Sequence, residues 1–201
     1  MNDRIPPEDL LLQAVKERSI PAIDELLRLN VDINSEGLIG LTPLLVAAMN
    51  NDAEMIEWLI VHGADVDYHR SRPPLVGGPA TALAMAAASN AVEAMETLLR
   101  HKAEVDLPYK DNGMTALMYA AEKNAKEAAE RLIDAGADLE ARTYGMFGGP
   151  KKTALSVAAI NSAKEVVKLL LNRNVDAKPL RKARKEIPAG MVKWLKAKGV
   201  L

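Results

Sequence analysis

Apolar residues recur along this chain as pairs of short helical stripes separated by polar turns. In the stretch that starts at Thr42, "TPLLVAAMNN", nearly every position before the two asparagines is apolar or small. The next stretch places Met55, Ile56, Leu59 and Ile60 three or four residues apart, which is the spacing of one helix face. We therefore expect a first helix, a turn and a second helix, neither of which can bury its apolar side alone.

The helix pair repeats along the sequence. The first-helix stretch occurs four times, beginning at Thr42, Thr81, Thr115 and Thr153. A second amphipathic stretch follows each copy, such as "AVEAMETLLRHKAEVD" after Asn90. Two weaker copies flank these four, one aligned at Asp9 and one at Lys178. Because stacked units of this kind bury a continuous core, the sequence predicts an all-α solenoid.

Each copy carries residue types that suit their positions. The Thr hydroxyl, and Asp9 in the first copy, can cap the first helix by accepting a hydrogen bond from an early backbone N–H. Pro43 and Pro179 suit the first helical position, and Ala-Ala pairs such as Ala120–Ala121 let neighbouring units approach closely. Asparagine tolerates the left-handed backbone of a helix–helix turn, and it ends three of the first-helix stretches (Asn51, Asn90 and Asn124).

These motifs resemble the ankyrin repeat over essentially the whole chain. "EGLIGLTPLLVAA" and "WLIVHGADVD" match the two halves of the family pattern almost letter for letter. The histidine that the family places after T-P-L, which ties neighbouring repeats together, is missing from every copy (Leu45, Ala84, Met118 and Ser156 stand there). The resemblance implies an ankyrin solenoid with a less regular stack, similar in length to the small stand-alone ankyrin proteins of bacteria.

The resemblance also implies one domain over residues 1–201. We expect it to consist of an N-terminal capping unit, four internal repeats and a C-terminal capping unit. These units span residues 1–36, 37–69, 76–109, 110–142, 148–177 and 178–201.

Two of the finger loops between successive units are extended. The finger after Asp67 and the finger after Glu140 carry insertions of about five or six residues, each with a Gly-Gly-Pro sequence. Ankyrin proteins bind partners with these fingers and with the concave face of the first helices, so the resemblance implies a protein partner here. The expected contact residues are Tyr68, Arg70, Arg72, Leu75, Val76, Tyr109, Tyr144, Met146, Phe147, Met49 and Ile160.

The apolar residues of the two extended fingers have a second interpretation. Leu75, Val76, Met146 and Phe147 can instead fold back as lids over the first helices. The stretch "GMFGGPKKT" also raises nucleotide binding at the Gly-Gly-Pro loops as an alternative. However, Pro150 stands where a phosphate-binding loop has its second glycine and removes a backbone N–H.

Charge is distributed unevenly although the net charge is only −1. Residues 1–67 hold thirteen acids and four bases, whereas residues 178–201 hold eight bases and one acid. We expect a monomer in which the basic unit is a solvated cap, and we do not expect nucleic acid as a partner. Polyanion binding by this cap and weak head-to-tail association of copies are the alternatives.

Composition excludes several classes of chemistry and of fold. Aromatic residues make up only 3% of the chain, which disfavours a sandwich or barrel core, and cysteine is absent. The three histidines show no metal-ligand spacing, and no apolar run is long enough to span a membrane. We therefore expect a non-enzymatic, cytoplasmic protein-interaction scaffold or adaptor, with no catalytic residues, metal or cofactor.

Overall fold

The computed structural model describes residues 5–70, 78–144 and 151–201, and within these ranges it contains helices and no strands. The twelve helices of the described residues are α1 (Pro7–Lys16), α2 (Ile20–Arg28), α3 (Pro43–Met49), α4 (Ala53–Val61), α5 (Ala82–Ala88), α6 (Val92–Arg100), α7 (Ala116–Lys123), α8 (Lys126–Asp134), α9 (Ala154–Ile160), α10 (Lys164–Asn172), α11 (Lys178–Ala183) and α12 (Ala189–Ala197).

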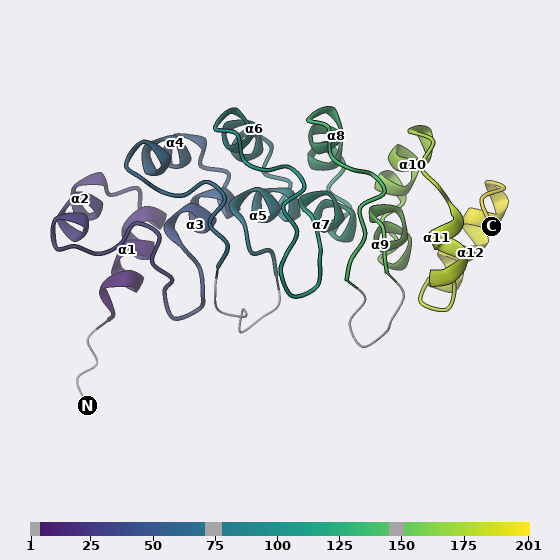
Figure 1. Cartoon of the computed structure of the whole chain (residues 1–201), viewed down its shortest axis with the longest axis horizontal. Helices are drawn as coiled ribbons and strands as arrows, with labels where there is room; N and C mark the ends of the chain where they lie inside the picture. Colours follow the sequence, from purple (N-terminus) through teal and green to yellow (C-terminus); the bar gives the residue numbers. More distant parts are fainter. Residues whose placement is uncertain (1–4, 71–77, 145–150) are drawn as a thin grey trace.

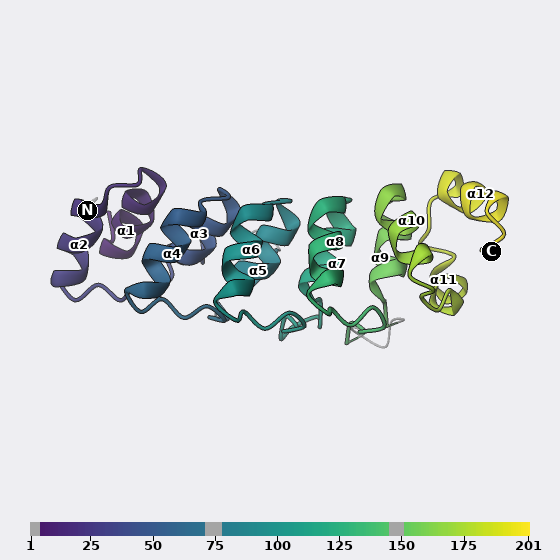
Figure 2. The ribbon, with the colours of Figure 1, turned by 90° about the horizontal axis from the view of Figure 1, so that it is seen from above.

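The helices from α1 to α10 form hairpins that stand side by side along one axis, and α11 and α12 follow at the C-terminal end (Figure 1). The first helices make one row and the second helices make another (Figure 1), and the view from above shows the pairs following one another along the same axis (Figure 2). The fingers leave the row of first helices on one side, and the first and last units lie at opposite ends of the array. The predicted all-α solenoid is therefore confirmed.

The seam between neighbouring units is built from alanine. The four Ala-Ala pairs predicted to allow close approach are all at most 1% exposed (Ala47–Ala48, Ala86–Ala87, Ala120–Ala121 and Ala158–Ala159). Larger side chains of the second helices, such as Leu59, Leu98 and Leu132, fill the space between the two rows and are completely buried. Small residues at the seam and larger side chains from both rows thus give a thin but continuous core.

The predicted caps of the first helices are confirmed only in part. Thr42 and Thr81 accept hydrogen bonds from the N–H groups three residues later, at 3.3 and 3.2 Å, but Thr115 makes no such bond. In the last internal repeat the hydroxyl of Ser156 accepts a hydrogen bond from the Thr153 N–H at 2.8 Å. A serine in the first turn thus also ties down the start of α9.

In the two terminal units, the predicted start of the first helix was wrong by one to three residues. Asp9 does not cap α1, because that helix begins at Pro7, and the Asp9 carboxylate instead accepts a hydrogen bond from the Leu38 N–H at 3.1 Å. Lys178 is the first residue of α11, so Pro179 occupies the second helical position. Proline is tolerated at either position because neither N–H has a partner within the helix.

The turns within the helix pairs have the left-handed conformation that asparagine was expected to supply. Asn51, Asn90 and Asn124 have φ angles of 56°, 53° and 55°. Their side-chain oxygens also accept hydrogen bonds from the first turn of the second helix in the following unit, at the N–H groups of Ala94 (2.9 Å), Ala128 (3.0 Å) and Val166 (3.4 Å). We call this series the turn ladder.

A second series of hydrogen bonds links the units at the base of the fingers. The side-chain oxygen of the residue that opens a finger accepts a hydrogen bond from a backbone N–H near the end of the next unit. The pairs are Asn34 with Asp65 (2.9 Å), Asp67 with Glu104 (3.0 Å), Asp106 with Asp138 (3.0 Å) and Glu140 with Asp176 (2.8 Å). We call this second series the finger-base ladder. The two ladders connect adjacent units in a chain that lacks the histidine of the ankyrin pattern.

Candidate functional site

The described parts of the four fingers lie on one face of the solenoid, and we number the fingers along the chain. They comprise residues 34–42, 67–81, 106–115 and 140–153, and they follow α2, α4, α6 and α8 (Figure 1). Five of the predicted contact residues lie outside the described residues, namely Arg72, Leu75, Val76, Met146 and Phe147. The choice between open fingers and lids therefore stays a prediction.

The second and third fingers are held together by buried polar groups. Arg70 is 2% exposed and donates a hydrogen bond from Nη2 to the Gly78 carbonyl at 2.9 Å, which joins the two arms of the second finger. The hydroxyl of Tyr119, from α7, donates to the same carbonyl at 3.3 Å. His69 contacts the Pro108 carbonyl in the third finger at 3.2 Å.

Burial changes the role expected for Arg70 and Tyr109. Both were expected as surface contacts, but Tyr109 is only 7% exposed and its ring stacks against His69, with 5.6 Å between ring centroids. Loss of hydration lowers the pKa of Arg70 and raises the pKa of Tyr109 to about 12. In this structure the two residues support the fingers from inside and do not form their surface.

Because Tyr109 is buried with a neutral hydroxyl, we expect the free energy of unfolding to fall at alkaline pH. Because the folded-state pKa lies above the ordinary value near 10, the stability linked to this group is complete below about pH 10 and is lost as the pH rises through about 12. Tyr109→Phe should flatten this decline, measured as urea midpoints across that range. Tyr144→Phe, at a half-exposed position, is the matched control, and equal slopes for wild type and Tyr109→Phe would contradict the assignment.

The third and fourth fingers also contact each other closely. The Tyr144 N–H donates a hydrogen bond to the Asn112 carbonyl at 2.8 Å, and the Tyr144 ring covers Gly113. A Cβ on Gly113, which has φ 74°, would lie 2.7 Å from that ring, so this position requires glycine. The Tyr144 side chain remains 50% exposed and is available to a partner.

The first finger carries an apolar tip that the sequence analysis did not select. Leu38 is 65% exposed and Ile39 is 55% exposed. They lie in "EGLIGLT", where two large apolar residues stand between glycines just as they precede Gly-Gly-Pro in the extended fingers. The signal was therefore present, but loop length was used to choose the candidate fingers, and the first finger is short.

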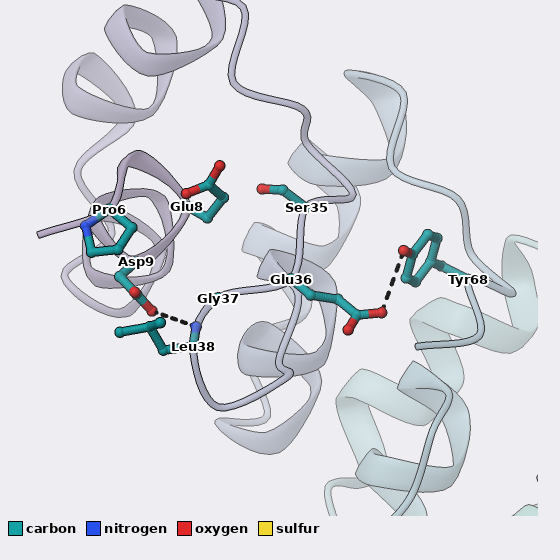
Figure 3. A pocket seen from close by; sticks show the side chains of 8 residues that line it. All are labelled: Pro6, Glu8, Asp9, Ser35, Glu36, Gly37, Leu38 and Tyr68. Carbon is teal, nitrogen blue, oxygen red and sulfur yellow. Dashed lines mark hydrogen bonds between the residues drawn. The ribbon is translucent and has the colours of Figure 1, made fainter. Parts of the chain in front are cut away.

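A pocket of about 370 Å³ opens beside this tip, between the start of α1 and the first two fingers (Figure 3). It is lined by Pro6, Glu8, Asp9, Ser35, Glu36, Gly37, Leu38 and Tyr68. Gly37 permits the close approach of finger and helix, because a Cβ there would lie 2.5 Å from the Asp9 carboxylate. Tyr68 donates a hydrogen bond to Glu36 at 3.4 Å, and burial followed by the charge of Glu36 raises the pKa of Tyr68.

The pocket has the chemistry of a receptor for a cationic group. Three carboxylates line it and no basic side chain does. Asp9 Oδ2 and Ser35 Oγ are buried and have no hydrogen-bond partner among the described residues, so both can accept a further donor. In residues 5–70, 78–144 and 151–201 no group of three or more His, Cys, Asp or Glu side chains is arranged to hold a metal ion.

The two predicted contacts on the first helices stay separate from the pocket. Met49 ends α3 and is 44% exposed, whereas Ile160 ends α9 and is partly buried, with α5 and α7 between them. Among the predicted contact residues that the structure describes, Tyr68 alone lines the pocket. None of the described helices has the length and apolar character needed to cross a membrane.

Comparison with protein families agrees with this architecture. A family model made of three ankyrin repeats matches residues 11–76 and again residues 75–143. A model of a single ankyrin repeat matches residues 151–182. No curated protein matches the sequence closely enough to count as a relative.

Proposed function

Since the chain belongs to the ankyrin repeat family, whose members generally mediate protein–protein interaction, we propose that it is a non-enzymatic scaffold that binds a protein partner through its finger face. The observation that carries the proposal is the pairing of an exposed apolar tip, Leu38 and Ile39, with a carboxylate-lined pocket. Apolar side chains exposed at a finger tip contribute no stability to the fold, but they contribute binding energy once a partner covers them.

The chemistry of this region indicates what the partner presents. A Lys or Arg side chain fits a pocket that offers Glu8, Asp9 and Glu36, and an apolar neighbour of that side chain fits over Leu38 and Ile39. The ion pair fixes orientation and accelerates encounter, whereas the apolar contact supplies more of the affinity. The recognised segment is therefore basic and apolar side by side.

The rest of the finger face extends the same surface. Tyr144 offers a half-exposed aromatic ring from the fourth finger, whereas Met49 offers an apolar side chain outside the fingers, at the far end of α3. The extended fingers themselves, with Leu75, Val76, Met146 and Phe147, remain part of the proposal from their sequence. Because the two ladders already hold the units in place, little ordering entropy is lost when a partner binds.

A pull-down from a lysate of the cells that express this protein tests the proposal. Wild type is compared with Leu38→Ser, and bound proteins are identified by mass spectrometry after circular dichroism shows equal folding. We expect a retained protein whose recovery falls about tenfold in Leu38→Ser, because the change removes one apolar anchor. Recovery should also fall as salt is raised, since the pocket contribution is electrostatic.

The matched control is Val61→Ser, which removes an apolar side chain that is 70% exposed at the end of α4, in the second-helix row and outside the fingers. Recovery with Val61→Ser should equal that with wild type. Equal recovery with Leu38→Ser as well would place the binding surface elsewhere. A variant with Leu38, Ile39, Tyr144, Leu75, Val76, Met146 and Phe147 all changed to serine that still retains every wild-type partner would reject the finger face altogether.

A further inference from the structure

Each end of the solenoid carries an open groove, which lies between the two helices of the unit at the N-terminal end and along the last helix at the C-terminal end. The groove at the N-terminal end, between α1 and α2, has a volume of about 440 Å³ and is lined by Leu10, Gln13, Ala14, Glu17, Ala22, Glu25, Leu26 and Leu29. The groove at the C-terminal end, along α12, has a volume of about 500 Å³ and is lined by Arg184, Ile187, Ala189, Val192, Lys193 and Lys196. We call them the head groove and the tail groove.

The head groove is apolar in its floor and acidic at its edges. Its residues repeat at intervals of three and four along both helices, so they form one stripe on each. Leu29 is 68% exposed and Leu10 is 38% exposed, which is unusual for the outer face of a terminal repeat. Glu17 and Glu25 are the charged residues of its lining, and no base lines it.

The tail groove has the opposite charge. Ala189, Val192, Lys193 and Lys196 form one stripe of α12, while the buried residues Met191 and Leu195 lie on another side of the helix. The groove lining contains three bases and no acid. Within the described ranges, none of the eight bases of residues 178–201 forms an ion pair, whereas the one acid, Glu186, pairs with Lys152 at 2.6 Å.

We propose that the tail groove of one copy docks on the head groove of another, so that copies of this chain associate head to tail. Two glutamates face three bases across the contact, and apolar stripes meet beneath them. The contact adds a further unit to an array whose units already follow one another along a single axis (Figure 2). Such a contact joins two different surfaces and therefore does not close after two copies.

The head groove favours a second copy over a polyanion as the occupant of the tail groove. A polyanion would neutralise the three bases of the tail groove but would leave the apolar stripe of the head groove, with Leu29, open to water. A second copy neutralises the bases of the tail groove and covers the apolar stripe of the head groove in a single contact. The stripe beneath the bases, Ile187 and Val192, is also apolar and so matches a protein surface rather than a phosphate backbone.

Sedimentation velocity of the purified 201-residue chain tests this contact. The average mass should rise with protein concentration at about 0.01 M salt and return to that of a monomer at about 1 M salt, because the screening length falls from roughly 30 Å to roughly 3 Å. A wild-type chain that stays monomeric at low salt would overturn the proposal, including the case in which it then binds a short oligonucleotide through the basic unit.

Two variants each block one end. Leu29→Arg changes the head groove, and the pair Lys193→Glu with Lys196→Glu changes the tail groove; all three side chains are exposed. Each variant alone should weaken self-association about tenfold or more. The matched control, Lys178→Glu with Lys182→Glu, makes the same charge change in the same unit outside the groove lining and should associate as wild type does.

Mixing the two blocked variants distinguishes this contact from a symmetric one. Each variant keeps one intact end, so an equimolar mixture should form a dimer and nothing larger, and this also shows that both are folded. Blocked variants that associate like wild type, or a mixture that stays monomeric, would overturn head-to-tail docking.

Discussion

Replacing Asn90 with alanine is expected to lower the free energy of unfolding by about 2–4 kcal/mol. Two losses combine. Alanine pays the cost of the left-handed backbone, φ 53°, and the Ala128 N–H loses the acceptor that lies 3.0 Å away in the next unit. Because Ala128 is fully buried, water does not readily replace that acceptor. Urea denaturation followed by circular dichroism measures the effect.

Two further variants separate the causes. Asn90→Gly keeps the left-handed backbone at little cost and should lose only the hydrogen-bond part, about 1–3 kcal/mol. Asn50→Ala is the same change in the turn of the preceding unit, at an exposed position with φ −86°. It should change the free energy of unfolding by less than about 0.5 kcal/mol. If Asn90→Ala matched Asn50→Ala, the turn ladder would contribute nothing to the stack.

The features within each unit could be predicted because the same sequence pattern recurs in every unit. The Ala-Ala seam, the left-handed asparagines and the period of the second helices are all set by neighbours within about four residues. The same pattern gave a wrong prediction where two nearby residues could both begin a helix. At the start of α1 either a proline or an aspartate can begin the helix, and the contact of Asp9 with Leu38 in the first finger decided between them.

The bonds between units could not be predicted in this way. Asn90 was identified for its backbone, whereas its partner Ala128 lies 38 residues away and becomes a neighbour only once the units stack. The missing family histidine suggested a less regular stack, yet side chains already present at the turns and finger bases link the units. Such a role depends on the relative placement of two repeats, which no single repeat contains.

The candidate site shows the same division between chemistry and burial. Residue type alone favoured Arg70 and Tyr109 as contacts, because arginine and tyrosine are enriched at interfaces. In the folded chain both residues are buried, so they support the fingers from inside and leave the surface to other side chains. Leu38 shows the converse, since its exposure follows from a short finger tip between glycines that reaches beyond the first helices.

Replacing Ala121 with leucine is the other change expected to have a large effect, a loss of about 1–3 kcal/mol in the free energy of unfolding. Ala121 is completely buried on α7, which packs between α5 and α9. A leucine there must push one neighbouring unit away. This displacement should also lengthen the turn-ladder hydrogen bond that the Val166 N–H donates to the Asn124 side-chain oxygen, already 3.4 Å long. Thermal or urea unfolding measures the loss.

The consequence of that change should extend beyond one repeat. In a solenoid each unit is stabilised chiefly by the interface with its neighbour, so a weakened seam at α7 divides the array near its middle. Ala135→Leu, the same change at the exposed end of α8 in the same repeat, should be neutral within about 0.5 kcal/mol. Equal stability for both leucine variants would mean that the seam has room for larger side chains, and that the alanine pairs do not set the spacing that holds the fingers side by side.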